Sequence, residues 1–208
     1  MTLQLIYAFD PLCGWCYGFA PALRALREER QDLRIDVRMG GLVTGERIGP
    51  YAAAADYIRG ASARMTAVTG AALGPAFWSD VIGNPGVMSS SIPPCDVLLQ
   101  VRRHAPHRVL DLAEAIQIAH FRDGHDLNDA ATYIRLLGKL EIDLEPQVPD
   151  PRDVRPDLAE EFARSRRMGL ASYPTLLLET EHGFKAIAIA YDPKELVSRV
   201  DESVEGVL

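Results

Sequence analysis

The alternation of apolar and polar residues divides the chain into two sheet-forming ends around a helical middle. Residues 3–9 form an apolar, aromatic and β-branched run, which is typical of a buried strand. In residues 17–30 the apolar side chains Phe19, Leu23 and Leu26 recur at helical spacing. Residues 33–39 then alternate apolar and charged positions until Gly40, as a strand with one covered face does. The N-terminal end therefore predicts a strand, a helix and a second strand.

The rest of the chain predicts a helical stretch followed by a hairpin and a last helix. Two strands are expected after Pro174, with His182-Gly183 in the turn between them, and Pro193 opens the final helix. The order β-α-β, helices, β-β-α is that of an α/β thioredoxin-like fold interrupted by an α-helical insertion domain. We expect a discontinuous domain of residues 1–44 and 169–208, and an insertion domain of residues 45–168. Helices are expected near residues 46–69, 75–82, 92–104, 107–122, 128–140 and 155–168, and the late strands at residues 175–179 and 184–190.

Composition narrows the class of protein. The 208 residues are 48% hydrophobic, enough to bury a substantial core. The net charge is −7 and the basic residues are dispersed, which disfavours nucleic acid as a partner. No apolar run reaches the length of a membrane span. The chain enters its first strand almost at once, without the regions of a secretory leader, so we expect a cytoplasmic protein.

The most informative chemistry lies between the first strand and the first helix, where Cys13 and Cys16 are separated by Gly14 and Trp15. A C-x-x-C pair in that position indicates a redox motif. The free N–H groups and the dipole of a first helical turn stabilise a thiolate. We expect Cys13, at that end and more exposed, to be the nucleophile, and Cys16 to be the resolving thiol. The ring of Trp15 is expected to restrict access to Cys16.

Two other interpretations of the cysteines remain. Half of a zinc site is one, because His104 and His107 are three apart and lie near Cys95. A structural site needs four ligands, however, and no second Cys or His pair has the usual zinc-finger spacing, so we expect no metal. An inert structural disulfide is the other, and a cytosolic thiol pool would reduce it. Cys95 could form a disulfide with a partner or serve as a second redox relay, but we favour a buried residue that behaves as a small hydrophobe.

Two short motifs carry a resemblance to a known family. Residues 10–17 resemble the D-x-x-C-x-W-C start of DsbA-like thioredoxin proteins, particularly the FrnE-like and predicted cytoplasmic disulfide-isomerase branch. Residues 172–175 resemble the loop in which a cis-proline of that fold faces the active-site disulfide. The resemblance implies a thiol-disulfide oxidoreductase or disulfide isomerase that works through a mixed disulfide. It also implies a disulfide- or thiol-containing protein or small molecule as substrate, glutathione as a candidate exchange partner, and no bound cofactor beyond the redox-active Cys13–Cys16 disulfide.

Three further residues complete the candidate site. Pro174 begins a strand, where a cis X-Pro bond is permitted, and the Tyr173 backbone would then face the C-x-x-C and pair with an extended substrate. An ordinary trans proline at a strand start is the alternative. Asp10 ends the apolar first strand, where a carboxylate is costly unless it is solvated or paired. It either relays the proton of Cys16 or forms the Asp-Pro turn that caps the first helix.

Two other functions stay open on the same fold. Glutathione-dependent enzymes similar to 2-hydroxychromene-2-carboxylate isomerase or the kappa transferases carry a serine where this chain has Cys13, so the intact C-x-x-C argues against them. A non-catalytic binding module is the third candidate. The dipeptide between the cysteines influences the reduction potential of the couple, but it does not by itself set the direction of exchange. The redox potential of the compartment also decides whether the protein oxidises or reduces its substrate.

Overall fold

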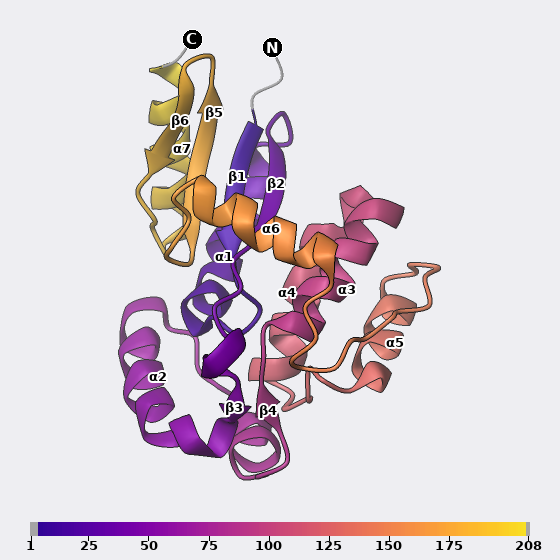
Figure 1. The fold of residues 1–208 in the computed structure, drawn as a ribbon. Helices are drawn as coiled ribbons and strands as arrows, with labels where there is room; N and C mark the ends of the chain where they lie inside the picture. Colours follow the sequence, from indigo (N-terminus) through magenta and orange to yellow (C-terminus); the bar gives the residue numbers. More distant parts are fainter. Residues whose placement is uncertain (1–3, 207–208) are drawn as a thin grey trace.

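A four-stranded sheet is the centre of the molecule in the computed structural model, which describes residues 4–206 (Figure 1). Its strand order is β2-β1-β5-β6, with β1 parallel to β2 and antiparallel to β5. β5 and β6 form the expected antiparallel hairpin. Leu3, which the sequence places in the first strand, lies outside the described residues. The strands are β1 (Gln4–Phe9), β2 (Arg34–Met39), β5 (Thr175–Thr180) and β6 (Gly183–Ile187).

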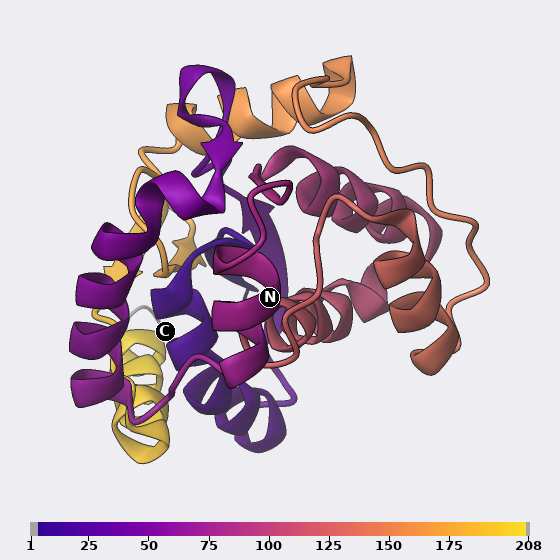
Figure 2. The same cartoon turned by 90° about the horizontal axis from the view of Figure 1, so that it is seen from below.

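Helices cover both faces of this sheet. α1 connects the parallel strands β1 and β2, and α7 packs beside α1. α6 lies on the opposite face, across the strands near the end of β2, as the two perpendicular views show (Figures 1 and 2). The expected α/β fold class, with β-α-β and β-β-α ends, is confirmed. The helices are α1 (Gly14–Glu29), α2 (Ala55–Thr69), α3 (Ile92–His104), α4 (Val109–Phe121), α5 (Ala130–Lys139), α6 (Pro156–Arg167) and α7 (Pro193–Glu205).

The helical segment, residues 45–168, departs from the sequence prediction at its start. Residues 46–69 were expected to be one helix, but only Ala55–Thr69 is α-helical. Before it, the strand β3 (Gly49–Pro50) lies between the 3-10 turns η1 (Gly45–Arg47) and η2 (Tyr51–Ala54). β3 pairs with β4 (Met88–Ser89) to form a short antiparallel ribbon. Pro50 has an extended ψ of 137° and no N–H to offer a helix, and Tyr51 N donates to Val87 O at 3.0 Å instead.

Two smaller differences also have a physical cause. The segment η3 (Phe77–Ile82) is a π-helix, and Gly83 N donates to Trp78 O at 3.0 Å, five residues back. The last strand was expected to reach residue 190, but it ends at Ile187. Arg199 on α7 binds the carbonyls of Ala188 and Ile189 at 3.1 and 2.8 Å, so a side chain satisfies groups that a strand would otherwise pair.

A buried ion pair joins the helical segment to the sheet. Glu161 on α6 is buried and accepts two hydrogen bonds from Arg102 on α3, at 2.9 and 2.6 Å. Arg102 also donates to Val37 O on β2 at 3.1 Å. Burial alone would raise the pKa of Glu161, but the hydrogen bonds and charge of Arg102 lower it overall. The C-terminal end of β2, which leads into the site, is thereby held in place. None of the described helices is long and apolar enough to cross a bilayer.

Candidate active site

The C-x-x-C forms the turn from β1 into α1. Cys13 N donates to Asp10 O at 3.0 Å, which closes the turn after the strand. Cys13 is the N-cap of α1, with an extended conformation (φ −84°, ψ 108°), and its carbonyl accepts from Cys16 N and Tyr17 N at 3.0 and 3.1 Å. A side chain at this position leaves the backbone where the free N–H groups and the dipole of the helix favour negative charge.

The two thiols, both free, differ in environment. Cys16 faces the core and is 0% exposed, whereas Cys13 is 6% exposed. Burial raises the pKa of Cys16 well above its ordinary value, and the hydrogen bond and charge of Cys13 raise it further. Cys16 therefore holds its proton in the reduced protein, and Cys13 is the more accessible of the two sulfurs.

The loop before β5 lies directly against Cys13. The Cys13 thiol donates to Tyr173 O at 3.4 Å, and the peptide bond between Tyr173 and Pro174 is cis. The Tyr173 hydroxyl lies 3.0 Å from Gly40 O and 3.2 Å from Leu170 O, and its single hydrogen is shared between these two acceptors. Desolvation raises the pKa of Tyr173 to about 12, so this hydroxyl keeps its proton at neutral pH. Gly40, which follows β2, thus holds the loop in which the carbonyl of Tyr173 faces the sulfur of Cys13.

Asp10 is fully buried, and its carboxylate joins three segments. It accepts hydrogen bonds from Leu12 N at 2.9 Å, Leu42 N at 2.7 Å and the Ser91 hydroxyl at 2.9 Å. Burial raises its pKa, against the lowering effect of these bonds. Among the hydrogen bonds of residues 4–206, none joins a carboxylate oxygen of Asp10 to a thiol. The geometry therefore favours the turn-forming role over direct proton relay. The expected capping of the first helix by Asp10 is wrong, because the N-cap of α1 is Cys13, no side chain caps it, and Asp10 binds Leu12 N before the helix begins.

Gly14 and Trp15 border a cavity of about 260 Å³ beside Cys13. The Trp15 ring packs against Tyr191, with centroids 5.8 Å apart. Opposite these residues stands α2, where Tyr57 is 74% exposed. The cavity is mostly apolar, and its lining comprises Leu12, Cys13, Gly14, Trp15, Leu42, Tyr51, Tyr57, Ile58, Ala61, Ser62, Met65, Leu73, Phe77, Phe121, Ala171, Ser172 and Tyr173.

Cys95 lies apart from this turn, fully buried in the first turn of α3. Burial raises its pKa well above the ordinary value. Its environment suits a small apolar side chain better than a nucleophile. Within the part of the chain that the structure describes, no group of three or more His, Cys, Asp and Glu side chains is placed to hold a metal ion.

The structure adds residues that the sequence did not single out. Ser91 and the Leu42 amide bind Asp10, and Gln117 on α4 reaches the turn from the other side. Gln117 falls on the same stripe of α4 as the polar residues Asp111, Glu114 and His120, so the sequence gives no signal that its side chain is buried against the turn.

Comparisons with known proteins establish the fold. No family model and no curated protein matches the sequence. Among solved structures, the cytosolic disulfide reductase DsbM from Pseudomonas aeruginosa is 23% identical, with a TM-score of 0.78 over 97% of this chain and 98% of that one. DsbM with GSH gives 22% identity and a TM-score of 0.79 over 97% and 99% of the two chains. A protein from Nitrosomonas europaea assigned as a protein disulfide isomerase gives 23% and 0.76 over 99% of both. The chain therefore has a DsbA-like thioredoxin fold.

Proposed function

We propose that the protein is a thiol-disulfide oxidoreductase that uses Cys13 as nucleophile and Cys16 as resolving thiol. The observation that carries this proposal is the contact of 3.4 Å between the Cys13 thiol and Tyr173 O. A disulfide substrate in extended conformation can pair with that backbone while its sulfur meets Cys13. The names of the similar structures, a disulfide reductase and a disulfide isomerase, support the same chemistry.

The exchange balances without any bound cofactor. The Cys13 thiolate attacks one sulfur of a substrate disulfide, and the second substrate sulfur leaves as a thiolate that takes up a proton. Cys16 then loses its proton and attacks the Cys13 sulfur of the mixed disulfide. The first substrate thiol is released, and two electrons have passed from the two cysteines to the substrate. Two molecules of a thiol such as glutathione return the Cys13–Cys16 disulfide to the reduced state.

The site favours a peptide-like disulfide over a bare small thiol. Its cavity of about 260 Å³ is mostly apolar and extends from Cys13 along α2 to the exposed ring of Tyr57. We propose glutathione as the exchange partner, in line with the DsbM structure that contains GSH.

The cytosolic description of DsbM supports a cytoplasmic location, where reduction or isomerisation is the expected direction of the exchange.

Reduction of insulin disulfides with glutathione as donor tests the proposal. Wild type should be active, and Cys13→Ser should lose at least about 100-fold in rate because no thiolate attacks. Cys95→Ala is the matched control, since it removes a cysteine that lies outside the site, and it should keep wild-type activity. A Cys13→Ser protein as active as wild type would refute the assignment.

A second experiment isolates the resolving step. Cys16→Ala should accumulate a mixed disulfide with oxidised glutathione, visible as an added mass on the intact protein. In Cys13→Ser/Cys16→Ala that adduct should be absent. Equal adduct formation in both variants would contradict the proposed division of roles.

A further inference from the structure

The side chain of Gln117 links the helical segment to the C-x-x-C turn. It lies on α4 and is 3% exposed. Its Nε2 atom is within 3.4 Å of Asp10 O and within 3.4 Å of Cys13 O. One amide therefore has a hydrogen for each of two carbonyls, which lie on either side of Pro11 and Leu12.

These two carbonyls define the conformation of the turn. Asp10 O accepts a hydrogen bond from the Cys13 amide. Cys13 O accepts hydrogen bonds from the amides of Cys16 and Tyr17, and these bonds form the first turn of α1. Gln117 donates to both acceptors from outside the turn. It thereby holds the backbone of Cys13 against the end of β1 while leaving the sulfur free to face Tyr173.

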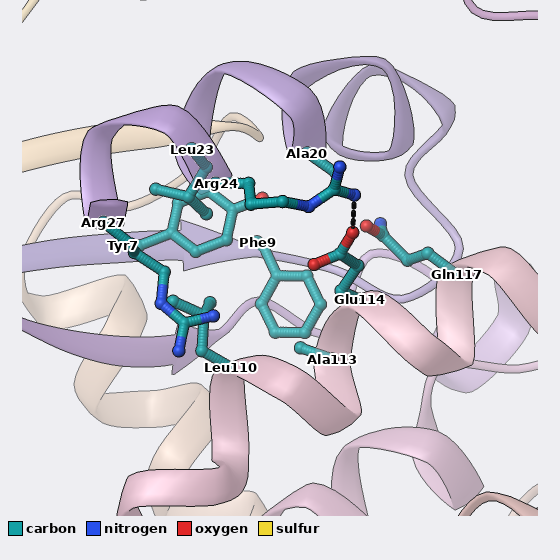
Figure 3. A pocket seen from close by; sticks show the side chains of 10 residues that line it. All are labelled: Tyr7, Phe9, Ala20, Leu23, Arg24, Arg27, Leu110, Ala113, Glu114 and Gln117. Carbon is teal, nitrogen blue, oxygen red and sulfur yellow. Dashed lines mark hydrogen bonds and ion pairs between the residues drawn. The ribbon is translucent and has the colours of Figure 1, made fainter. Parts of the chain in front are cut away.

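Gln117 also lies at the edge of a small cavity, beside an ion pair. Figure 3 shows it next to the ion pair of Arg24 on α1 and Glu114 on α4, one turn earlier. All three line a small cavity of about 20 Å³ between α1 and α4, floored by Tyr7 and Phe9 of β1. A cavity of this size has room for about one water molecule. The Gln117 side chain therefore lies where α1, α4 and β1 meet.

We propose that Gln117 is a positioning residue for the redox couple, through which α4 sets the stability of the Cys13–Cys16 disulfide. The inference rests on the proposed function. Its physical basis is effective concentration: a turn that holds the two sulfurs at bonding distance favours their intramolecular disulfide over mixed disulfides with a free thiol. Without the donor, the turn has more conformations and the disulfide becomes less favoured.

The test is the equilibrium constant of the Cys13–Cys16 couple in glutathione redox buffers. Gln117→Met removes both donors at similar volume, and it should lower the constant for disulfide formation about tenfold, which corresponds to about 30 mV. Gln100→Met is the matched control. Gln100 on α3 makes hydrogen bonds to Asp96 and Gln147 O, at 2.6 and 2.7 Å, away from the site. It should leave the constant within about twofold of wild type.

A structural role alone gives a different result. If Gln117 only packs the core, Gln117→Met lowers the unfolding midpoint while the glutathione equilibrium constant stays at the wild-type value, and the inference is wrong. Where Gln117→Met does not fold, Gln117→Asn provides the measurement, because it keeps an amide that is one methylene too short to reach both carbonyls. The same fall in the constant is expected, and an unchanged constant again overturns the inference.

The outcomes separate this inference from the proposed function. A wild-type protein that equilibrates with glutathione but does not accelerate the reduction of insulin contradicts the proposed oxidoreductase activity. The effect of Gln117 on the Cys13–Cys16 equilibrium would still be measurable in that protein.

Discussion

The thiol of Cys13 lies 3.4 Å from the backbone carbonyl oxygen of Tyr173, although 160 positions separate the two residues in the chain. The Tyr173 hydroxyl, which shares its hydrogen between Gly40 O and Leu170 O, holds the loop in that place. The contact joins the turn after β1 to the loop before β5. Neighbouring antiparallel strands make this possible, because the end of β1 and the start of β5 meet at one edge of the sheet.

Cys13 should be the first cysteine to react with an alkylating agent. Cys16 and Cys95 are both 0% exposed, and burial raises the pKa of each well above the ordinary value. We expect iodoacetamide at pH 7 to label Cys13 at least about tenfold faster than either, since the thiolate is the reactive form. Peptide mass spectrometry over time measures the three rates. Equal rates would remove the basis for calling Cys13 the nucleophile.

Gly40→Ala should disturb the Tyr173 loop. A Cβ at Gly40 would lie 2.0 Å from Cζ and 2.3 Å from the hydroxyl oxygen of Tyr173, so the ring has to move. We expect a loss of about 1–3 kcal/mol in the free energy of unfolding and about a tenfold loss of disulfide reductase rate. Urea unfolding and the insulin assay measure the two effects.

The matched control is Gly49→Ala. Its added Cβ meets nothing within 4 Å, and its φ is not in the left-handed region, so both measurements should stay at wild-type values. If Gly40→Ala keeps full activity, the position of the Tyr173 loop is not needed for catalysis.

Asp10→Ala should lower the stability of the folded protein. The substitution leaves Leu12 N, Leu42 N and the Ser91 hydroxyl without their acceptor in a buried site. Each unsatisfied buried donor costs about 1–3 kcal/mol, so a loss of about 3 kcal/mol or more in the free energy of unfolding is expected. Asp143→Ala, at an exposed position, should change the same quantity by less than about 0.5 kcal/mol. A similar small change for both variants would show that the three hydrogen bonds contribute little.

His120 should make the protein less stable in mild acid. Burial lowers the pKa of His120 to about 4, and its ring makes hydrogen bonds with the Tyr51 hydroxyl at 2.8 Å and His125 O at 3.0 Å. The unfolded chain binds the proton near pH 6.5 and the folded chain only near pH 4. Stability due to this group is therefore complete above about pH 6.5 and is lost as the pH falls toward 4. The two values correspond to about 3 kcal/mol.

The difference between wild type and His120→Gln isolates that contribution. Urea unfolding at several pH values between 4 and 7 should give a difference in free energy that changes by about 3 kcal/mol across the window. The other titratable groups are the same in both proteins, so their contributions to the free energy of unfolding cancel in the difference. A difference that is constant with pH would mean that His120 does not stay neutral in the folded state.

Local patterns accounted for most of the element order. The apolar run of β1, the alternation in β2 and the turn residues before β6 depend on neighbours in sequence, and the strands appear where these patterns place them. The helices α3 to α6 begin and end within a few residues of the expected positions, because glycine and proline mark their ends. The ribbon of β3 and β4 was missed, since each strand has two residues and no periodicity.

The sequence by itself determined the order of strands and helices and the position of the C-x-x-C at a strand-to-helix turn, because both depend on side chains close together in the chain. Only the tertiary structure decided which distant groups meet that turn. The hydrogen bonds of Ser91 and Leu42 to Asp10, the contact of Gly40 with Tyr173 and the reach of Gln117 each join residues more than thirty positions apart. Such pairs follow from how helix and sheet faces pack, and no local spacing specifies which faces will touch.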